Sequence, residues 1–250
     1  MKLKKVLKII GIAAGSLVLL AVLVGILNAV VAGGEWNLGW TDYRYDDSGY
    51  EAGAGSVITD GITAIDVDWI DGSVKVELCQ DRFISLSEQS GEELSEESML
   101  HYRVSADGKT LSVKYRASSW YFGNSKNKNK TLILRIPEHM IESGQLQSLK
   151  IKTVSGAVVV DATPIGTPGE GEAPLSMALQ KLSVQTKSGD VRLILSKDAP
   201  FTLKFDSKRD QKPSISFDCT KKNGKYVFGG GGMNVTVVTD RGKLTVSPVK

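Results

Sequence analysis

The chain contains few residues of the kinds that enzymes use for catalysis or metal binding. Its two histidines, His101 and His139, belong to no HExxH pattern or related spacing that would hold a catalytic zinc ion. The sequence has no G-x-S-x-G nucleophile elbow, and the run 229–232 of glycines lacks the Lys-Ser or Lys-Thr that completes a phosphate-binding loop. We therefore predict a non-enzymatic protein with no catalytic residue, no cofactor and no metal ion.

Three aspartates and two cysteines are the remaining candidates for chemistry. Asp66, Asp68 and Asp71 lie in one strand-like run, where alternate residues share a face and their carboxylates could attract calcium. A solvated strand face is the simpler interpretation. Cys79 and Cys219 are too few for a structural zinc site, although an extracytoplasmic location would permit a disulfide between them. We favour two buried thiols over a disulfide.

The segment 120–130, with the sequence WYFGNSKNKNK, has the composition of a ligand-binding loop. Aromatic rings can stack on sugars or enter a membrane interface, and ammonium groups attract wall phosphates or anionic lipid. The alternative is that the aromatic rings pack on the body and the lysines only solvate a hairpin tip. We predict a candidate ligand-facing loop made of Trp120, Tyr121, Phe122, Lys126, Lys128 and Lys130.

The N-terminal residues have the pattern of a membrane anchor. Residues 9–32 are apolar apart from Ser16 and Asn28, and this length of helix covers the roughly 30 Å hydrocarbon core of a bilayer. Because lysines precede the segment, the positive-inside rule keeps residues 1–8 in the cytoplasm and places the rest outside. A cleaved signal peptide is the alternative, but its apolar region would span only about 7–15 residues. We predict a single-pass protein of the cell membrane.

Composition and charge exclude several classes of protein. With 41% apolar and 24% charged residues, the chain is neither collagen-like nor disordered throughout. Four of the 31 basic residues precede residue 33, so the remaining 27, set against 28 acidic residues, give residues 33–250 a net charge of −1. A nucleic-acid-binding protein needs a basic face that displaces phosphate counterions, so we predict no nucleic-acid partner.

Beyond residue 33 the apolar residues alternate with period two, which predicts strands. A twelve-residue unit recurs four times without gaps: IDVDWIDGSVKV from Ile65, LKIKTVSGAVVV from Leu149, LSVQTKSGDVRL from Leu182 and VTVVTDRGKLTV from Val235. Glycine occupies the eighth position of every unit, where a turn between short strands often needs a positive φ angle. We expect the four structural turn glycines to be Gly72, Gly156, Gly189 and Gly242.

Two further patterns extend this β-rich body. A degenerate fifth copy runs from Phe201 to Phe217, with a looser turn where Ser-Gly is expected. Residues 100–115 predict a hairpin that turns at Asp107-Gly108, and residues 132–136 predict a strand that ends at Pro137. These elements would lengthen the sheet.

Repeated strand units cannot bury their apolar faces alone, so we expect them to stack. The predicted fold is all-β: an irregular single-domain β-solenoid preceded by one transmembrane helix, with a β-sandwich as the alternative. The predicted domain boundaries are 1–8 for the basic cytoplasmic tail, 9–32 for the transmembrane helix, 33–60 for a juxtamembrane linker and N-terminal cap, and 61–250 for the β-strand-repeat domain.

The apolar anchor, the opening IDVDWIDGSVKVE, the DGKTLSVKY hairpin and the T-x-S-G-x-V units together resemble the bacterial putative-adhesin family of β-strand-repeat proteins. The similarity covers roughly residues 55–250, and its motifs specify strand architecture rather than chemistry. The resemblance implies a β-helical, membrane-anchored extracytoplasmic domain, commonly in Gram-positive bacteria, and it transfers no catalytic residue.

These observations together predict a membrane-anchored interaction surface, adhesin-like or scaffolding, in the bacterial cell envelope. Its expected partners besides the membrane are cell-wall polymer, anionic lipid or a membrane protein. The alternative is an accessory protein of an envelope-stress signalling system that contacts a membrane sensor.

Overall fold

The computed structural model describes residues 45–91, 93–94, 98–115, 130–164 and 179–249. In these ranges the chain is built from strands, with one short helix, α2 (Glu138–Glu142), so the all-β prediction is confirmed. The predicted anchor, residues 9–32, lies outside the described residues. Across the ranges given above, no helix has the length and apolar character needed to cross a bilayer.

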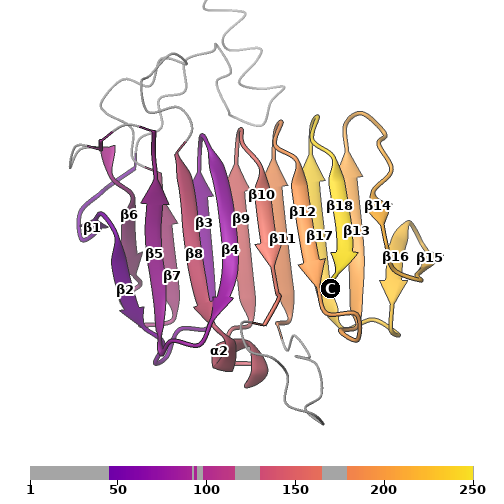
Figure 1. The fold of residues 1–250 in the computed structure, drawn as a ribbon, viewed down its shortest axis with the longest axis horizontal. Coiled ribbons are helices and arrows are strands. Elements are labelled where there is room, and N and C mark those ends of the chain that lie inside the picture. The colour runs from indigo at the N-terminus through magenta and orange to yellow at the C-terminus, as the bar shows by residue number, and fades with distance from the viewer. Residues whose placement is uncertain (1–44, 92, 95–97, 116–129, 165–178, 250) are drawn as a thin grey trace, which may run out of the picture. The chain divides into compact units, whose positions relative to one another are not determined.

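The strands form two open sheets that lie as two layers (Figure 1). The ten-stranded sheet has the order β1 (Glu51–Ala52), β6 (His101–Val104), β7 (Thr110–Lys114), β3 (Ala64–Trp69), β9 (Ser148–Thr153), β11 (Lys181–Thr186), β17 (Met233–Thr239), β13 (Phe201–Ser207), β16 (Lys225–Phe228) and β15 (Thr220–Lys222). The eight-stranded sheet has the order β14 (Ser214–Ile215), β18 (Leu244–Pro248), β12 (Val191–Leu195), β10 (Val158–Asp161), β4 (Ser73–Cys79), β8 (Thr131–Pro137), β5 (Phe83–Gln89) and β2 (Gly55–Ile58).

Each twelve-residue repeat is an arch between the two layers. Its first strand joins the ten-stranded sheet and its second joins the eight-stranded sheet, so the two strands of a repeat do not pair with each other. Instead, each strand pairs in parallel with the corresponding strand of the next repeat, and Leu149 is the register partner of both Ile65 and Leu182. The repeats therefore stack in register, as solenoid coils do. In the sandwich alternative, the two strands of each repeat would instead pair with each other as a hairpin.

The irregular spacing of the repeats along the chain has a simple structural origin. The four repeats are adjacent in both sheets, in the orders β3-β9-β11-β17 and β4-β10-β12-β18. The chain between the first and second repeats forms β5 to β8, and these strands lie on the far side of the first repeat. The chain between the third and fourth repeats forms β13 to β16 beyond the fourth repeat. The insertions thus extend the two ends of the stack and leave its centre uninterrupted.

The expected flanking elements are present. The hairpin β6–β7 is antiparallel and turns at Gly108, whose φ is +73°. The degenerate fifth copy is β13 and β14, which pair in parallel with β17 and β18. Residues 208–213 form its longer turn, as expected from the missing Ser-Gly.

The core fills the space between the two layers. In the repeat strands, these eight inward-facing residues are at most 2% exposed: Val67, Ile151, Val184, Val237, Val74, Val158, Val191 and Leu244. Each such side chain contributes about 1.5–3 kcal/mol when it is fully buried. Period-two alternation therefore places one face of every repeat strand in the core, as predicted.

The turn glycines form a column in which each arch contacts the next. A Cβ on Gly189 would lie 1.7 Å from the carbonyl oxygen of Gly156, and one on Gly242 would lie 1.9 Å from that of Gly189. A Cβ on Gly72 would similarly lie 1.8 Å from the carbonyl oxygen of Lys130. The expected positive φ occurs at Gly72 (+90°) and Gly156 (+83°) but not at Gly189 or Gly242. The requirement common to all four positions is close backbone approach.

Buried threonines complete the same turns. Thr153, Thr186 and Thr239 occupy the fifth position of their repeats and are at most 3% exposed. The Oγ1 of Thr186 accepts a hydrogen bond of 3.0 Å from the Gly189 amide, and the Oγ1 of Thr239 accepts one of 2.7 Å from the Gly242 amide. These bonds satisfy turn amides that the sheets leave unpaired.

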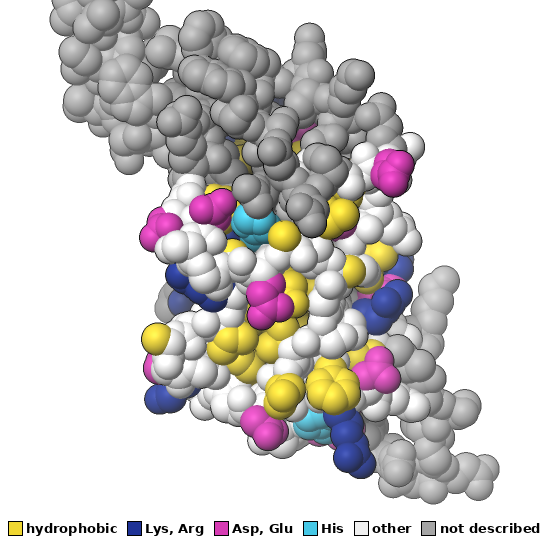
Figure 2. Space-filling view, turned by 90° about the vertical axis from the view of Figure 1, so that its left-hand side faces the viewer, with side chains coloured by type: hydrophobic (Ala, Val, Ile, Leu, Met, Phe, Trp, Pro, Cys, Tyr) yellow, Lys and Arg dark blue, Asp and Glu magenta, His cyan; other side chains and the backbone are white. Residues whose placement is uncertain are grey.

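Aromatic side chains fasten the start of the described chain to the β1 and β2 end of the stack. The Tyr45 hydroxyl lies 2.9 Å from Nδ1 of His101, and the Tyr50 ring stacks on His101 with centroids 6.1 Å apart. The Tyr102 hydroxyl donates to Glu51 at 2.6 Å, and burial together with this carboxylate raises the pKa of Tyr102 to about 12. Figure 2 shows hydrophobic side chains gathered on this end of the molecule. The most exposed large apolar residues also lie in strands here: Ile58, Phe83 and Val104.

The glycine column predicts a large effect for Gly189→Ala. Its φ is outside the left-handed region, so the loss would report the collision with the neighbouring arch rather than backbone strain. We expect the free energy of unfolding to fall by about 3 kcal/mol, measured by denaturant titration. Gly91→Ala is the matched control, because nothing lies within 4 Å of the added Cβ. Equal stability of the two variants would contradict the role of the column.

Candidate functional site

The predicted ligand-facing loop divides into two parts. Trp120, Tyr121, Phe122, Lys126 and Lys128 lie outside the described residues. Lys130 lies within them, and its side chain is 0% exposed, so the assignment of Lys130 to a ligand-facing surface is wrong.

Lys130 forms the centre of a buried cluster. Its Nζ lies 2.9 Å from Oε2 of Glu88, whose side chain is only 6% exposed, and it donates a hydrogen bond to the carbonyl of Ser98. The same ammonium lies 4.5 Å from the centroid of the Tyr115 ring and 5.4 Å from that of Trp69. The two rings meet edge to face, with centroids 4.9 Å apart. The Lys130 side chain therefore packs in the interior of the fold and does not face a ligand.

Burial and charge oppose each other at this cluster. Removal from water lowers the pKa of Lys130, while the Glu88 carboxylate acts in the opposite direction. Burial likewise raises the pKa of the Tyr115 hydroxyl. A buried charge is tolerated only when its partner and hydrogen bonds are in place, which explains why Glu88 and Lys130 occur as a pair.

Other expected candidates also have structural roles. The Asp68 carboxylate lies 3.0 Å from Nζ of Lys114, and Asp71 accepts hydrogen bonds from Ser155 and from the Gly72 amide. In the described ranges, no group of three or more His, Cys, Asp or Glu side chains could hold a metal ion. Asp68 and Asp71 are thus engaged by a neighbouring strand and a neighbouring arch.

Both cysteines are free thiols, as favoured from the sequence, but the expectation that both are buried is wrong for Cys219. Cys79 is buried at the end of β4, and Cys219 is partly exposed. Burial raises the pKa of the Cys79 thiol, which disfavours the reactive thiolate.

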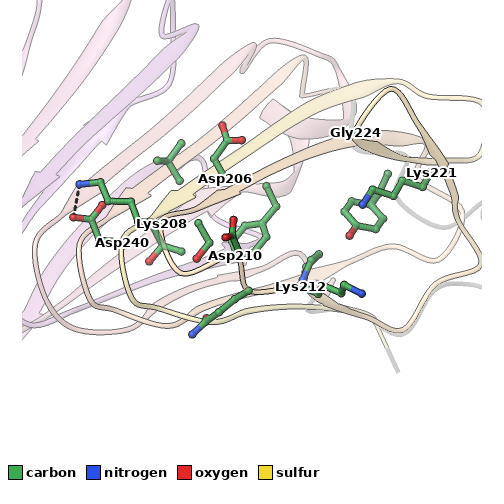
Figure 3. A pocket seen from close by; sticks show the side chains of 14 residues that line it. Asp206, Lys208, Asp210, Lys212, Lys221, Gly224 and Asp240 are labelled. Atoms are coloured by element: carbon green, nitrogen blue, oxygen red, sulfur yellow. Dashed lines mark hydrogen bonds and ion pairs between the residues drawn. The ribbon is translucent and has the colours of Figure 1, made fainter.

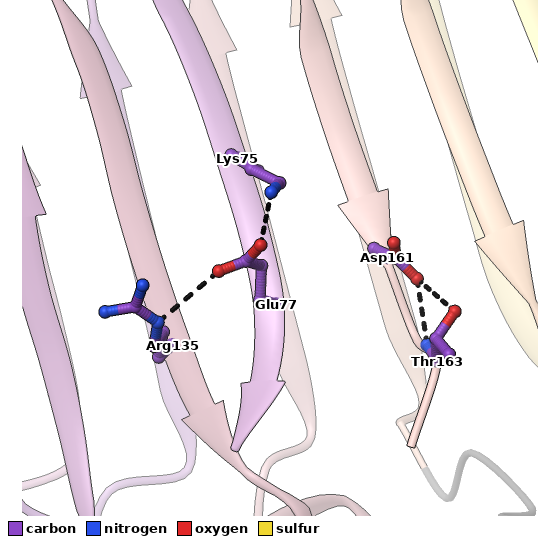
Figure 4. A network of polar contacts seen from close by, with 5 residues as sticks. All are labelled: Lys75, Glu77, Arg135, Asp161 and Thr163. Atoms are coloured by element: carbon purple, nitrogen blue, oxygen red, sulfur yellow. Dashed lines mark hydrogen bonds and ion pairs between the residues drawn. The ribbon is translucent and has the colours of Figure 1, made fainter. Parts of the chain in front are cut away.

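The outer face of the eight-stranded sheet carries charges that pair with one another (Figure 4). Glu77 forms ion pairs with Lys75 on its own strand and with Arg135 on β8, the latter at 3.4 Å. Asp161 accepts hydrogen bonds from the amide and hydroxyl of Thr163, at 2.9 and 2.5 Å. This face is polar and half-exposed, and the side chains drawn in Figure 4 satisfy one another.

A cavity of about 480 Å³ lies at the opposite end of the stack from β1 and β2 (Figure 3). Three segments line it: β13 with the turn that follows, the hairpin β15–β16, and the end of β17 with Asp240. Its charged residues are Asp206, Lys208, Asp210, Lys212, Lys221 and Asp240, and Phe205 and Tyr226 supply aromatic surface. We call this site the C-terminal cavity.

The local backbone explains how these segments present their side chains. Asp210 adopts a left-handed φ of +51°, a conformation that Asp tolerates better than most residues. Asn223 (+50°) and Gly224 (+74°) form the tight turn of the hairpin β15–β16, as expected for an Asn-Gly pair. Sequence analysis missed this cavity, although Asn223-Gly224 and the loose turn after Ser207 were available as signals.

The buried pair predicts a specific pattern of stabilities. Lys130→Met should lower the free energy of unfolding by about 3–5 kcal/mol, because it leaves the Glu88 carboxylate buried without a partner. The double variant Lys130→Met with Glu88→Leu should recover much of this loss. Thermal and denaturant unfolding of the three proteins would measure the coupling. If the double variant is less stable than Lys130→Met alone, the unpaired Glu88 carboxylate is not the cause of the lost stability.

Comparisons with known proteins place these features in a family. A family model, Toastrack DUF4097, matches residues 62–247. The fold is similar to a putative cell adhesion protein from Clostridium sporogenes ATCC 15579 (10% identity, TM-score 0.53, covering 80% of this chain and 100% of that chain). A putative adhesin from Bacteroides fragilis NCTC 9343 matches with 11% identity and a TM-score of 0.29, covering 81% and 98% of the two chains. No curated protein matches the sequence. On the strength of the family match, the chain belongs to the Toastrack DUF4097 family.

Proposed function

We propose that the protein is a single-pass membrane protein whose β-strand-repeat domain is a non-enzymatic, adhesin-like interaction surface in the bacterial cell envelope. The apolar segment 9–32 with its preceding lysines supports the anchor and its orientation. Family membership and the fold shared with a protein named for cell adhesion support the adhesin-like role.

The observation that carries the proposal is that apolar side chains lie between the two sheets, whereas polar side chains lie on their outer faces. The space between the sheets holds apolar side chains, and the buried Lys130–Glu88 pair and buried threonines serve the arches themselves. Polar groups instead form rows across the outer faces, such as Asp66, Lys150, Ser183 and Thr236 in register on four adjacent strands. Adjacent strands are about 4.8 Å apart, so these rows offer an extended surface to a partner.

The loop residues that lie outside the described ranges remain part of this proposal. Trp120, Tyr121 and Phe122 with Lys126 and Lys128 would supply stacking and positive charge to an anionic envelope surface. Lys130 is omitted because it is buried.

The anchored orientation predicts surface labelling. With a C-terminal epitope tag on the full chain, antibody should label intact cells of a Gram-positive host, and an N-terminal tag should be labelled only after the cells are permeabilised. The reason is that the positive-inside rule retains the lysine-rich tail in the cytoplasm. Labelling of the N-terminal tag in intact cells would contradict the orientation.

Envelope binding is tested with the full chain held in nanodiscs of neutral lipid. We expect it to sediment with isolated cell-wall sacculi or to float with phosphatidylglycerol vesicles, more strongly at low salt than at high salt. Lys126→Ser with Lys128→Ser should weaken binding about thirtyfold, since each ammonium contributes about 1 kcal/mol near a charged surface.

The matched control is Lys197→Ser with Lys243→Ser, which removes the same charge from exposed positions on the described body. It should bind as the unaltered protein does. If the protein binds neither surface, the adhesin-like role is overturned. If both double variants lose the same amount of binding, the loop has no specific part in envelope binding.

A further inference from the structure

The C-terminal cavity is large enough to hold a small-molecule ligand. Its volume of about 480 Å³ lies within the range typical of small-molecule sites, about 300–1,000 Å³. It is open to solvent at the end of the stack, where the β13–β14 turn, the hairpin β15–β16 and the end of β17 meet (Figure 3).

The chain segment that forms most of this end of the stack is basic, although the three lysines and three aspartates that line the cavity itself balance one another. Residues 201–228 hold seven basic and three acidic residues, a net charge of +4, whereas residues 33–250 as a whole carry −1. The stack therefore presents one basic end on a body that is otherwise weakly acidic, and an anionic ligand would be drawn to this end.

Two of the cavity's lysines have no acidic partner among the described residues. Lys208 is neutralised by Asp240 at 2.9 Å, and Asp206 is neutralised by Lys204 at 2.8 Å. Lys212 and Lys221 form no such ion pair in the described part of the chain, and the Lys221 ammonium lies 5.3 Å from the centroid of the Tyr226 ring. Both lysines are exposed and line the cavity, so they are available to a ligand's anionic group.

The rest of the lining suits a sugar. The half-buried rings of Phe205 and Tyr226 provide apolar surface on which a pyranose ring can pack. Asp210 is exposed and offers carboxylate oxygens to sugar hydroxyls. The Oε1 of Gln211 is shielded from solvent and accepts no hydrogen bond within the described structure. A buried acceptor without a partner costs free energy, so a ligand hydroxyl that donated to it would be bound favourably.

From these contacts we propose that the C-terminal cavity binds a saccharide that carries a carboxylate or phosphate group. Lys212 and Lys221 hold the anion, the rings of Phe205 and Tyr226 pack against the sugar, and Asp210 accepts from its hydroxyls. This inference rests on the proposed envelope-binding function and names the chemistry of the ligand. Acidic sugars of either kind combine a ring with an apolar C–H face, several hydroxyls and a negative group.

The test uses the full chain in detergent micelles and saccharide titrations followed by NMR or calorimetry. The probes are trigalacturonate for the carboxylate, glucose 6-phosphate for the phosphate, maltotriose as a neutral sugar and inorganic phosphate as an anion without a sugar. We expect at least one acidic sugar to bind about tenfold more tightly than maltotriose and than inorganic phosphate. The stronger of the two acidic probes identifies the anionic group.

The decisive variant is Lys212→Ser with Lys221→Ser, which should weaken binding of the acidic sugar about tenfold or more. Lys222→Ser with Lys225→Ser is its matched control. These exposed lysines lie on the hairpin β15–β16, as Lys221 does, but they do not line the cavity. It should bind within about twofold of the unaltered protein. Tyr226→Leu should weaken the acidic sugar but leave binding of inorganic phosphate unchanged.

Several results would overturn the inference: no binding of either acidic sugar, equal binding of maltotriose or phosphate, or equal loss in both lysine double variants. Sedimentation of the same proteins with cell-wall sacculi separates this failure from failure of the proposed function. If the unaltered protein sediments but Lys212→Ser with Lys221→Ser does so equally well, envelope binding stands and the cavity is not its site.

Discussion

The stack depends on the distance at which one arch turn approaches the next. At each turn glycine, the space that a Cβ would need is taken by a carbonyl group of the neighbouring arch, at 1.7–2.1 Å from the missing atom. This approach lets both strands of a repeat pair in register with those of the next one. The same constraint extends beyond the first repeat, where the backbone of Lys130, just before β8, lies against Gly72 in place of another glycine. The side chain of Lys130 is buried, and Glu88 supplies its charge partner.

The two ends of the stack differ because different insertions close them. At the β1 and β2 end, aromatic contacts of Tyr45 and Tyr50 with His101 fasten the incoming chain, and apolar side chains reach the surface (Figure 2). At the other end, the hairpin β15–β16 pairs with β13 and forms one wall of the C-terminal cavity. The middle of the stack consists of similar repeats. The features that differ from repeat to repeat in the described body therefore lie at its two ends, where the insertions are.

Periodicity was sufficient to predict the repeat strands of this fold, but not β1, β2, β5 or the hairpin β15–β16. Alternating apolar residues indicated the strands of all four repeats, the weak copy at β13 and β14 and the hairpin β6–β7, because burial between two sheets requires that alternation. Lys130 could not be placed in this way. It follows the same Asn-Lys alternation as Lys126 and Lys128, and only the distant Glu88 and the rings of Tyr115 and Trp69 distinguish it. The C-terminal cavity was hidden for a similar reason, since Tyr226, Asp210 and Asp240 come from three separate segments.

The amino-acid sequence by itself determined the strand character of the body, the side of each strand that is buried and the positions of the turns. It did so because these properties depend on local alternation and on glycine at one recurring position. Only the tertiary structure decided that the two strands of a repeat face each other as an arch instead of pairing as a hairpin. The same alternation buries the same residues in either arrangement. The choice is made by backbone pairing and close glycine contacts between repeats that are distant along the chain. The same long-range packing decided which lysine is buried and which lysines line a cavity.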